Sequence, residues 1–244
     1  MMERIITLKK ISDINTYSTF DAYLVESVFS SYFQFVFEKE KLIELINEIH
    51  LLNKKIYLKA DKILIEKEIS LLDEYVDIFS LVDGVFFEDF AFVSFFEEKN
   101  VETDLIYYPF DAIGDKEDIK ALLSFNIKRI CVPVGKEYLL NEEGLNAYLG
   151  YKAICIEPLF YTRRKILSLY DNVNGLRIDS KEYNLTEKTR TSIQKVIETD
   201  NGSMILLSDI HLYKEKQNVS FAIYDRTFID DELFLSLLKE EDYE

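Results

Sequence analysis

The chain has 244 residues and a formal net charge of −16, because 29 Lys and Arg stand against 45 Asp and Glu. A surface this acidic repels phosphate backbones and anionic lipid, so the charge disfavours nucleic acid and membrane surfaces as partners. With 48% hydrophobic residues, 7 glycines and 2 cysteines, the chain can bury a large core. It lacks the residues for a Gly-rich phosphate loop, a disulfide framework or a four-thiolate metal site.

The same composition predicts a cytoplasmic protein. No window approaches the roughly 18 uncharged apolar residues of a membrane span, and no apolar stretch follows the basic residues near the N-terminus. The two cysteines, Cys131 and Cys155, lie inside strand-like runs. We therefore expect buried core thiols in a reducing compartment.

Eight short runs of β-branched and aromatic residues are predicted as strands. In chain order they are 5–8, 22–25, 56–60, 84–87, 105–108, 129–132, 153–156 and 219–224. Apolar residues at helical spacing predict helices over 42–49, 69–79, 115–123, 141–149 and 233–238. Alternating strands and helices favour parallel pairing, and eight such units in about 250 residues predict an α/β fold, one (β/α)8 TIM-type barrel.

The stretch between the last two strand runs is too long for a simple crossover. It contains the turn Asp200-Asn201-Gly202 between the apolar runs 192–199 and 203–208, a pattern typical of a β-hairpin. We therefore expect residues 1–244 to form a single barrel domain. Residues 171–215 are expected to be a small β insertion on its C-terminal face.

Several carboxylates fall at or just beyond the ends of the predicted strands. They are Glu26, Asp61, Glu88, Asp89, Asp111 and Glu157. In a barrel these strand ends form the face that carries chemistry, so the carboxylates could hold a divalent cation or act as general acid and base. In a chain with 45 acidic residues several such positions also arise by chance, and both interpretations stay open.

A pair of arginines, Arg163 and Arg164, follows the seventh strand, with Tyr161 beside it. Paired guanidinium groups at a barrel mouth could bind a carboxylate or phosphate through two hydrogen bonds each. Alternatively, they only offset nearby carboxylates, and the tyrosine packs in the rim. The two histidines, His50 and His211, are too few for a His-rich zinc site.

Six segments in chain order share the pattern of a known family. They are 32–37, 49–58, 82–89, 157–165, 201–209 and 219–226. A helix ends in His50 before a basic turn, Val82-Asp83-Gly84 opens a strand that is closed by Asp89, and Asp225-Arg226 stands for a terminal Gly-Arg. Together these segments resemble the U32 peptidase family, also called collagenase-like proteases.

The resemblance implies a barrel that acts at its C-terminal face. The ligand-binding candidates are Arg163, Arg164, Tyr161, Glu157, Asp61, Asp89 and Arg226. Members of the family are known as peptidases, and others are implicated in hydroxylating tRNA, ribosomal RNA or a quinone precursor. Lys165 stands where the family's signature cysteine is expected, and no cysteine follows Cys155. No iron–sulfur cluster is therefore predicted, whereas a divalent cation stays open.

Three functional hypotheses follow. The first is a divergent U32-like protein that binds a small anionic or peptide ligand at the C-terminal barrel face, and hydrolyses it if the chain is an enzyme. The second is a noncatalytic barrel that pairs with another copy or with a related barrel. The third is a regulatory barrel resembling the glycerol-operon antiterminators, which would be expected to carry a Gly-rich loop that is absent after Ile154.

Overall fold

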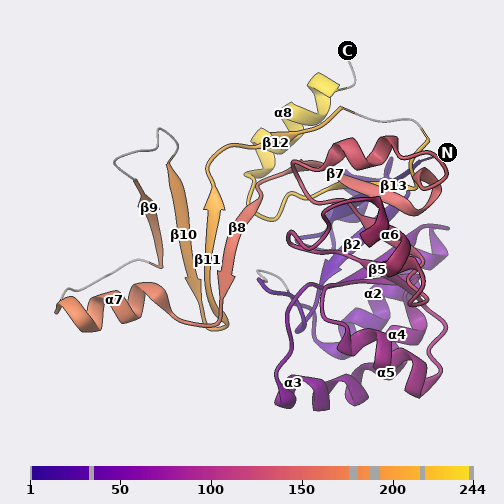
Figure 1. Ribbon diagram of the computed structural model, residues 1–244, viewed down its shortest axis with the longest axis horizontal. Coiled ribbons are helices and arrows are strands. Elements are labelled where there is room, and N and C mark those ends of the chain that lie inside the picture. Colours follow the sequence, from indigo (N-terminus) through magenta and orange to yellow (C-terminus); the bar gives the residue numbers. More distant parts are fainter. Residues whose placement is uncertain (1, 33–35, 176–180, 187–192, 215–217, 242–244) are drawn as a thin grey trace.

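The computed structural model describes residues 2–32, 36–175, 181–186, 193–214 and 218–241, and its centre is a closed barrel of eight parallel strands (Figure 1). The strands are β1 (Glu3–Thr7), β2 (Ala22–Glu26), β3 (Lys55–Ala60), β4 (Gly84–Phe87), β5 (Asp104–Tyr107), β6 (Arg129–Cys131), β7 (Leu149–Cys155) and β13 (Phe221–Tyr224). Pairing of β6 with β7 closes the ring, and β13 lies between β7 and β1. All eight predicted strands and the TIM-type fold are confirmed.

The segment that leads into strand β7 differs from the sequence prediction. The helix predicted over 141–149 is wrong, because short 3-10 turns at Glu137–Asn141 and Asn146–Tyr148 lead directly into a strand that begins at Leu149. Every residue of β7 is buried, as expected for a barrel strand covered on both sides. Gly150 is required there, since a Cβ atom would lie 2.4 Å from the ring of Phe221.

Helices cover the outside of the barrel. They are α1 (Asp13–Thr16), α2 (Lys39–Leu51), α3 (Glu66–Leu71), α4 (Val76–Leu81), α5 (Ala91–Lys99), α6 (Lys116–Leu123) and α8 (Asp231–Glu241). The helix predicted over 69–79 is divided by a 3-10 turn at Leu72–Tyr75. None of the helices within the described residues is both long and apolar enough to cross a bilayer.

The barrel interior is packed at its N-terminal end and becomes polar toward its C-terminal end. Phe86 packs edge-on against both Tyr57 and Phe221 inside the ring. Below them, Arg129 donates to Glu3 at 2.7 Å and to the Tyr57 hydroxyl at 2.9 Å, which closes the N-terminal opening.

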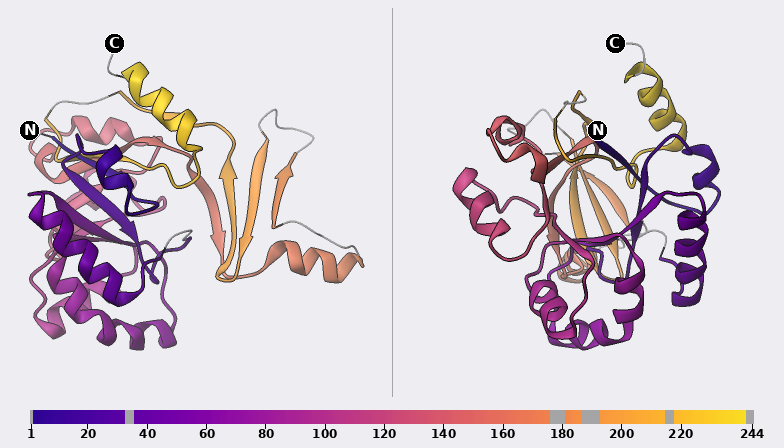
Figure 2. Two further views of the ribbon diagram at one scale, coloured as in Figure 1. Left: turned by 180° about the vertical axis from the view of Figure 1, so that it is seen from behind. Right: turned by 90° about the vertical axis from the view of Figure 1, so that its right-hand side faces the viewer.

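The insertion is a four-stranded antiparallel sheet that stands beside the barrel mouth (Figures 1 and 2). Its strands, in spatial order, are β8 (Pro158–Thr162), β11 (Gly202–Leu207), β10 (Gln194–Thr199) and β9 (Glu182–Leu185), and α7 (Ile166–Asn174) extends from it. The hairpin predicted at Asp200-Asn201-Gly202 is confirmed, since Thr199 pairs with Gly202.

The insertion begins earlier than the predicted boundary at 171, because β8 already belongs to the sheet. Of the predicted span 171–215, residues 176–180, 187–192 and 215 lie outside the described residues, as do residues 33–35 of the first family-like segment. A two-residue strand, β12 (His211–Leu212), then returns the chain to the barrel by pairing with β7.

Helix α6 offers a test of local capping. The Asp115 carboxylate accepts hydrogen bonds from the backbone N–H of Glu117 at 2.8 Å and of Asp118 at 3.2 Å. We expect Asp115→Ala to lower the free energy of unfolding by about 1 kcal/mol, the usual value of an N-cap. Urea denaturation measures this loss, and Glu143→Ala at an exposed position is the control. Equal effects of the two substitutions would contradict the capping role.

Candidate functional site

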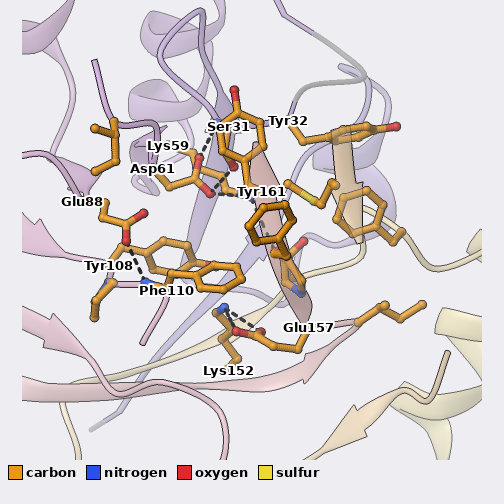
Figure 3. Close-up of a pocket in the computed structure, with 18 residues that line it drawn as sticks. Ser31, Tyr32, Lys59, Asp61, Glu88, Tyr108, Phe110, Lys152, Glu157 and Tyr161 are labelled. Atoms are coloured by element: carbon orange, nitrogen blue, oxygen red, sulfur yellow. Dashed lines mark hydrogen bonds and ion pairs between the residues drawn. The ribbon is translucent and has the colours of Figure 1, made fainter. Parts of the chain in front are cut away.

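A pocket of about 230 Å³ opens where the barrel strands end and the insertion sheet begins (Figure 3). Its floor is charged and consists of side chains from the ends of β3, β4, β7 and β13. Its walls are largely aromatic and come from Tyr32, Phe110, Phe160, Tyr161 and Phe228. A charged floor beneath apolar walls is the usual composition of a small-molecule site.

Two buried lysines carry the positive charge of the floor. Lys152 of β7 donates to both carboxylate oxygens of Glu157, at 3.0 and 2.8 Å. Lys59 of β3 lies 3.5 Å from an oxygen of Asp61 and 3.9 Å from one of Asp225. An ammonium group taken out of water costs several kcal/mol unless it is paired, so these carboxylates offset the cost of burying the two lysines.

Tyr108 contributes an aromatic face to both lysines. The Lys152 Nζ lies 4.8 Å from its ring centroid and the Lys59 Nζ lies 5.9 Å from it. Burial by itself would lower the pKa of Lys152, but Tyr108 and Glu157 outweigh it and hold this pKa well above its usual range. The pKa of Lys59 is also raised, because Asp61 and Asp225 outweigh the effect of burial. Both groups are therefore cations and not amine nucleophiles.

Asp61 connects the ends of β2 and β3. Its carboxylate accepts from the backbone N–H of Ser31 at 2.8 Å and from the Ser31 hydroxyl at 3.1 Å. The hydroxyls of Ser27 and Ser30 donate to the backbone carbonyl of Lys59 at 2.6 and 2.9 Å. These four bonds fix the loop after β2 on the edge of the pocket.

Asp225 enters the floor from the end of β13. Its carboxylate accepts from the backbone N–H of Thr227 at 3.0 Å and from the Thr227 hydroxyl at 2.6 Å. Burial alone would raise the pKa of Asp225, yet Lys59 and the Thr227 bonds outweigh burial and lower it. Asp225 is therefore a permanent negative charge beside Lys59.

Glu88 differs from the other carboxylates of the pocket. Its Oε1 atom accepts from the backbone N–H of Phe110 at 3.1 Å. Burial, with the negative charges of Asp61 and Asp89, raises the pKa of Glu88 to about 7, against the opposing effects of Phe110 N–H and Lys152. Glu88 is thus the group of the floor that can gain or lose a proton near neutral pH.

The structure brings together three of the residues predicted from the sequence. Asp61, Glu157 and Tyr161 all line the pocket, as does the strand-end carboxylate Glu88. The Tyr161 hydroxyl donates to the backbone carbonyl of Asn201 at 3.1 Å, so its ring is held at the wall by the hairpin turn.

The other predicted residues lie outside the pocket lining. Asp89 accepts from the backbone N–H of Leu64 at 2.7 Å and of Ala91 at 2.8 Å, at the start of α5. Arg163 donates to Glu68 of α3 at 3.0 Å, which ties the insertion to the loop after β3. The backbone N–H of Arg164 bonds the Thr162 hydroxyl, and its side chain is exposed. Their role in ligand binding stays a prediction.

Arg226 is fully buried, but between β13 and the outer helices. Its guanidinium lies 2.8 Å from Asp13 of α1 and 2.6 Å from Asp231 of α8, over the ring of Tyr17. These ion pairs offset the cost of burying its charge. They join the last strand to the first and last helices of the chain, away from the pocket lining.

Sequence reasoning missed Lys59, Lys152, Tyr108 and Asp225. A signal was present for the lysines, because each interrupts an otherwise apolar strand: Lys59 within 56–60 and Lys152 within Leu149–Cys155. A charged residue inside a strand buried on both sides indicates an interior polar site. Asp225 directly follows the predicted strand 219–224, so the strand-end position that indicated the other carboxylates could also have indicated Asp225.

The residues do not fit an iron–sulfur cluster held by four cysteine thiolates. The sequence has two cysteines, Cys131 and Cys155, and both are buried in β6 and β7. Burial raises the pKa of Cys131 to about 12, so this thiol is neutral. Within the part of the chain that the structure describes, no group of three or more His, Cys, Asp and Glu side chains could hold a metal ion. A divalent cation site stays a prediction.

The solved structure of one U32 peptidase agrees with this architecture. The structural alignment with the U32 peptidase Mk0906 covers 92% of this chain and 92% of the Mk0906 chain, with a TM-score of 0.55 and 12% sequence identity. The structural alignment with the spore cortex-lytic enzyme SleL of Bacillus cereus covers 98% of this chain and 74% of the SleL chain, with a TM-score of 0.43 and 10% sequence identity. No curated protein matches the chain.

The family comparison is more specific than the structural one. The sequence model of peptidase family U32 matches residues 9–142, which is more than half of the 244-residue chain. This match contains Lys59, Asp61, Glu88 and Tyr108, and hence much of the pocket floor. The chain therefore belongs to peptidase family U32.

Proposed function

We propose that this protein binds a small ligand bearing a carboxylate group, such as the C-terminal end of a peptide, in the pocket at the barrel mouth. Lys59 is the cation that holds it. The observation that carries the proposal is the geometry of Lys59: this residue lines the pocket, while the oxygens of Asp61 and Asp225 lie 3.5 and 3.9 Å from its Nζ. Both distances exceed the ~2.7–3.2 Å of a good hydrogen bond, so the ammonium has donors to offer an incoming carboxylate.

Lys152 has a different role. Glu157 occupies two of its donor positions at 2.8 and 3.0 Å, so this ammonium is engaged by the protein itself. It lies under the Tyr108 ring and adds positive potential to the floor. Lys152 therefore supports the site, whereas Lys59 contacts the ligand.

The pocket walls favour a ligand with an apolar body. Phe110, Phe160 and Phe228 lie around the opening, and Tyr32 packs against Phe228 with ring centroids 4.7 Å apart. A free carboxylate with an aromatic or aliphatic side chain would bury its apolar part against these rings. This is the chemistry of a small organic acid or of a short peptide.

We also propose that binding needs no iron–sulfur cluster, and the two buried thiols support this. Because the chain belongs to peptidase family U32, peptidase-like hydrolysis is the activity that we propose for the same pocket. Glu88, with a pKa of about 7, is the floor carboxyl that suits proton transfer to or from a reacting group.

A matched pair of probes tests the proposed function. We expect N-acetylphenylalanine to stabilise the protein against thermal unfolding, and its C-terminal amide to have no effect. A ligand at about 100 times its Kd adds roughly 2.7 kcal/mol, which a thermal-shift experiment resolves. Equal stabilisation by acid and amide, or none by either, would refute a carboxylate site.

The variant Lys59→Met should abolish the effect of the acid. Lys136→Met is the matched control, because Lys136 is a lysine outside the pocket lining that bonds the backbone carbonyl of Ile113 at 2.6 Å. Circular dichroism and urea denaturation check that the variants fold. Undiminished binding by folded Lys59→Met would show that another group holds the carboxylate.

A further inference from the structure

The floor of the pocket contains more negative than positive groups. Its charged residues are Lys59 and Lys152 with Asp61, Glu88, Glu157 and Asp225. Glu157 is bonded to Lys152, and Asp61 and Asp225 are both within ion-pair distance of Lys59. With Glu88 ionised, two lysines stand against four carboxylates, so the floor is more negative than with Glu88 neutral, when three carboxylates remain. Protonation of Glu88 therefore weakens the repulsion of the carboxylate ligand for which Lys59 has donors.

We propose that the pocket takes up its carboxylate ligand together with one proton from solvent, and that Glu88 carries this proton. The inference rests on the proposed function, since it requires a carboxylate ligand. The ligand stays an anion on Lys59, and the proton forms an O–H bond on the Glu88 carboxyl group. No bond of the ligand is broken, and the occupied pocket has the same net charge as the empty pocket with Glu88 ionised, because the charge of the proton offsets that of the ligand carboxylate.

The surroundings of Glu88 favour this assignment on geometric grounds. Its charged neighbours are Asp61 beyond β3, Asp89 beside it and Lys152 from β7, and Tyr107 of β5 is near enough for the charge of Glu88 to raise the tyrosine pKa. Two of the three charged neighbours are acidic, and Lys152 is already bonded to Glu157. One Glu88 oxygen accepts from Phe110 N–H, which leaves the other oxygen to bear a proton.

The titration of Glu88 places this proton in the physiological range. Burial is the largest cause that raises its pKa to about 7, with Asp61 and Asp89 adding to it. A neutral carboxyl group can donate a hydrogen bond to a bound carboxylate, whereas an ionised one repels it. Ligand affinity should therefore be highest below pH 7 and fall as the pH rises through this value.

The test measures binding of N-acetylphenylalanine by calorimetry between pH 6 and pH 8, a range in which the probe carboxylate stays ionised. The wild-type affinity should fall about tenfold over this range, because only the fraction of protein with protonated Glu88 is competent. In two buffers of different ionisation heat, the wild type should take up about one proton per ligand at pH 8.

Glu88→Gln imitates the protonated state and keeps an oxygen that can accept from Phe110 N–H. It should bind at pH 8 as tightly as the wild type does at pH 6, with no proton uptake. Asp111→Asn is the matched control: Asp111 follows the next strand, pairs with Lys136 at 2.6 Å and is exposed, so this variant should keep the wild-type pH profile.

Each outcome decides the inference. Wild-type affinity that is constant or rises with pH would overturn it, and so would a pH dependence that persists in Glu88→Gln. If neither protein binds the probe at any pH, the proposed carboxylate site itself fails. Binding without proton uptake, in contrast, leaves that site intact and refutes only the role of Glu88.

Discussion

Lys152→Met is expected to lower the free energy of unfolding by about 3–5 kcal/mol, the usual result of breaking a buried ion pair from one side. The variant leaves the Glu157 carboxylate buried at the barrel mouth without the ammonium that donates to both of its oxygens. It also removes the cation from the face of Tyr108. Equilibrium urea denaturation measures the loss.

A double-mutant cycle separates the buried charge from the packing. Lys152→Met combined with Glu157→Gln should recover much of the lost stability, because the second substitution removes the unpaired charge. Lys136→Met, at a partly exposed lysine outside the pocket lining, is the matched control. Strictly additive losses in the double variant would show that the pair does not act as a unit.

Arg226→Met is expected to cost about as much, roughly 3–5 kcal/mol, for the same physical reason. The guanidinium neutralises the buried Asp13, whose carboxylate also accepts from the backbone N–H groups of Lys9 and Lys10 at 2.9 and 3.1 Å. It further joins Asp231 of α8 to the end of β13. Loss of Arg226 should therefore loosen the contact between both ends of the chain, as measured by urea denaturation and by hydrogen exchange in α8.

The same variant separates a structural role from a ligand-binding role. At a temperature where Arg226→Met is folded, its affinity for N-acetylphenylalanine should equal that of the wild type, whereas Lys59→Met should not bind. Arg226→Lys should restore part of the stability, since lysine keeps the positive charge but cannot contact Asp13 and Asp231 at the same time as the guanidinium does. If folded Arg226→Met lost affinity for N-acetylphenylalanine, Arg226 would have a role in ligand binding.

Both effects have one origin in the composition of the chain. The chain has 45 acidic side chains and 29 basic ones, so carboxylates outnumber the cations that can pair with them. Where a lysine or arginine is buried, as Lys152 and Arg226 are, it neutralises carboxylates that could not be buried alone. These few buried cations should therefore contribute more to stability than the ion pairs on the surface.

Much of the fold was determined by the sequence by itself. The eight apolar runs became the eight barrel strands because a parallel strand covered on both faces needs a continuous apolar stretch, which is visible locally. The turn Asp200-Asn201-Gly202 formed the predicted hairpin for a similarly local reason. The helix predicted over 141–149 is wrong, because 3-10 turns occupy Glu137–Asn141 and Asn146–Tyr148, and Leu149 already pairs with β6 as the first residue of β7. Apolar spacing over so short a segment does not distinguish these structures.

The candidate site was decided by the tertiary structure. Strand-end position indicated Asp61, Glu88 and Glu157, because the end of a strand can be recognised in the sequence. It could not tell that Arg226 pairs with Asp13 of α1, or that Arg163 bonds Glu68 of α3, since these partners lie far away along the chain. Nor could it give the pairing of Lys152 with Glu157 or the pKa of Glu88. Those properties depend on burial and on charges that converge only when the barrel closes.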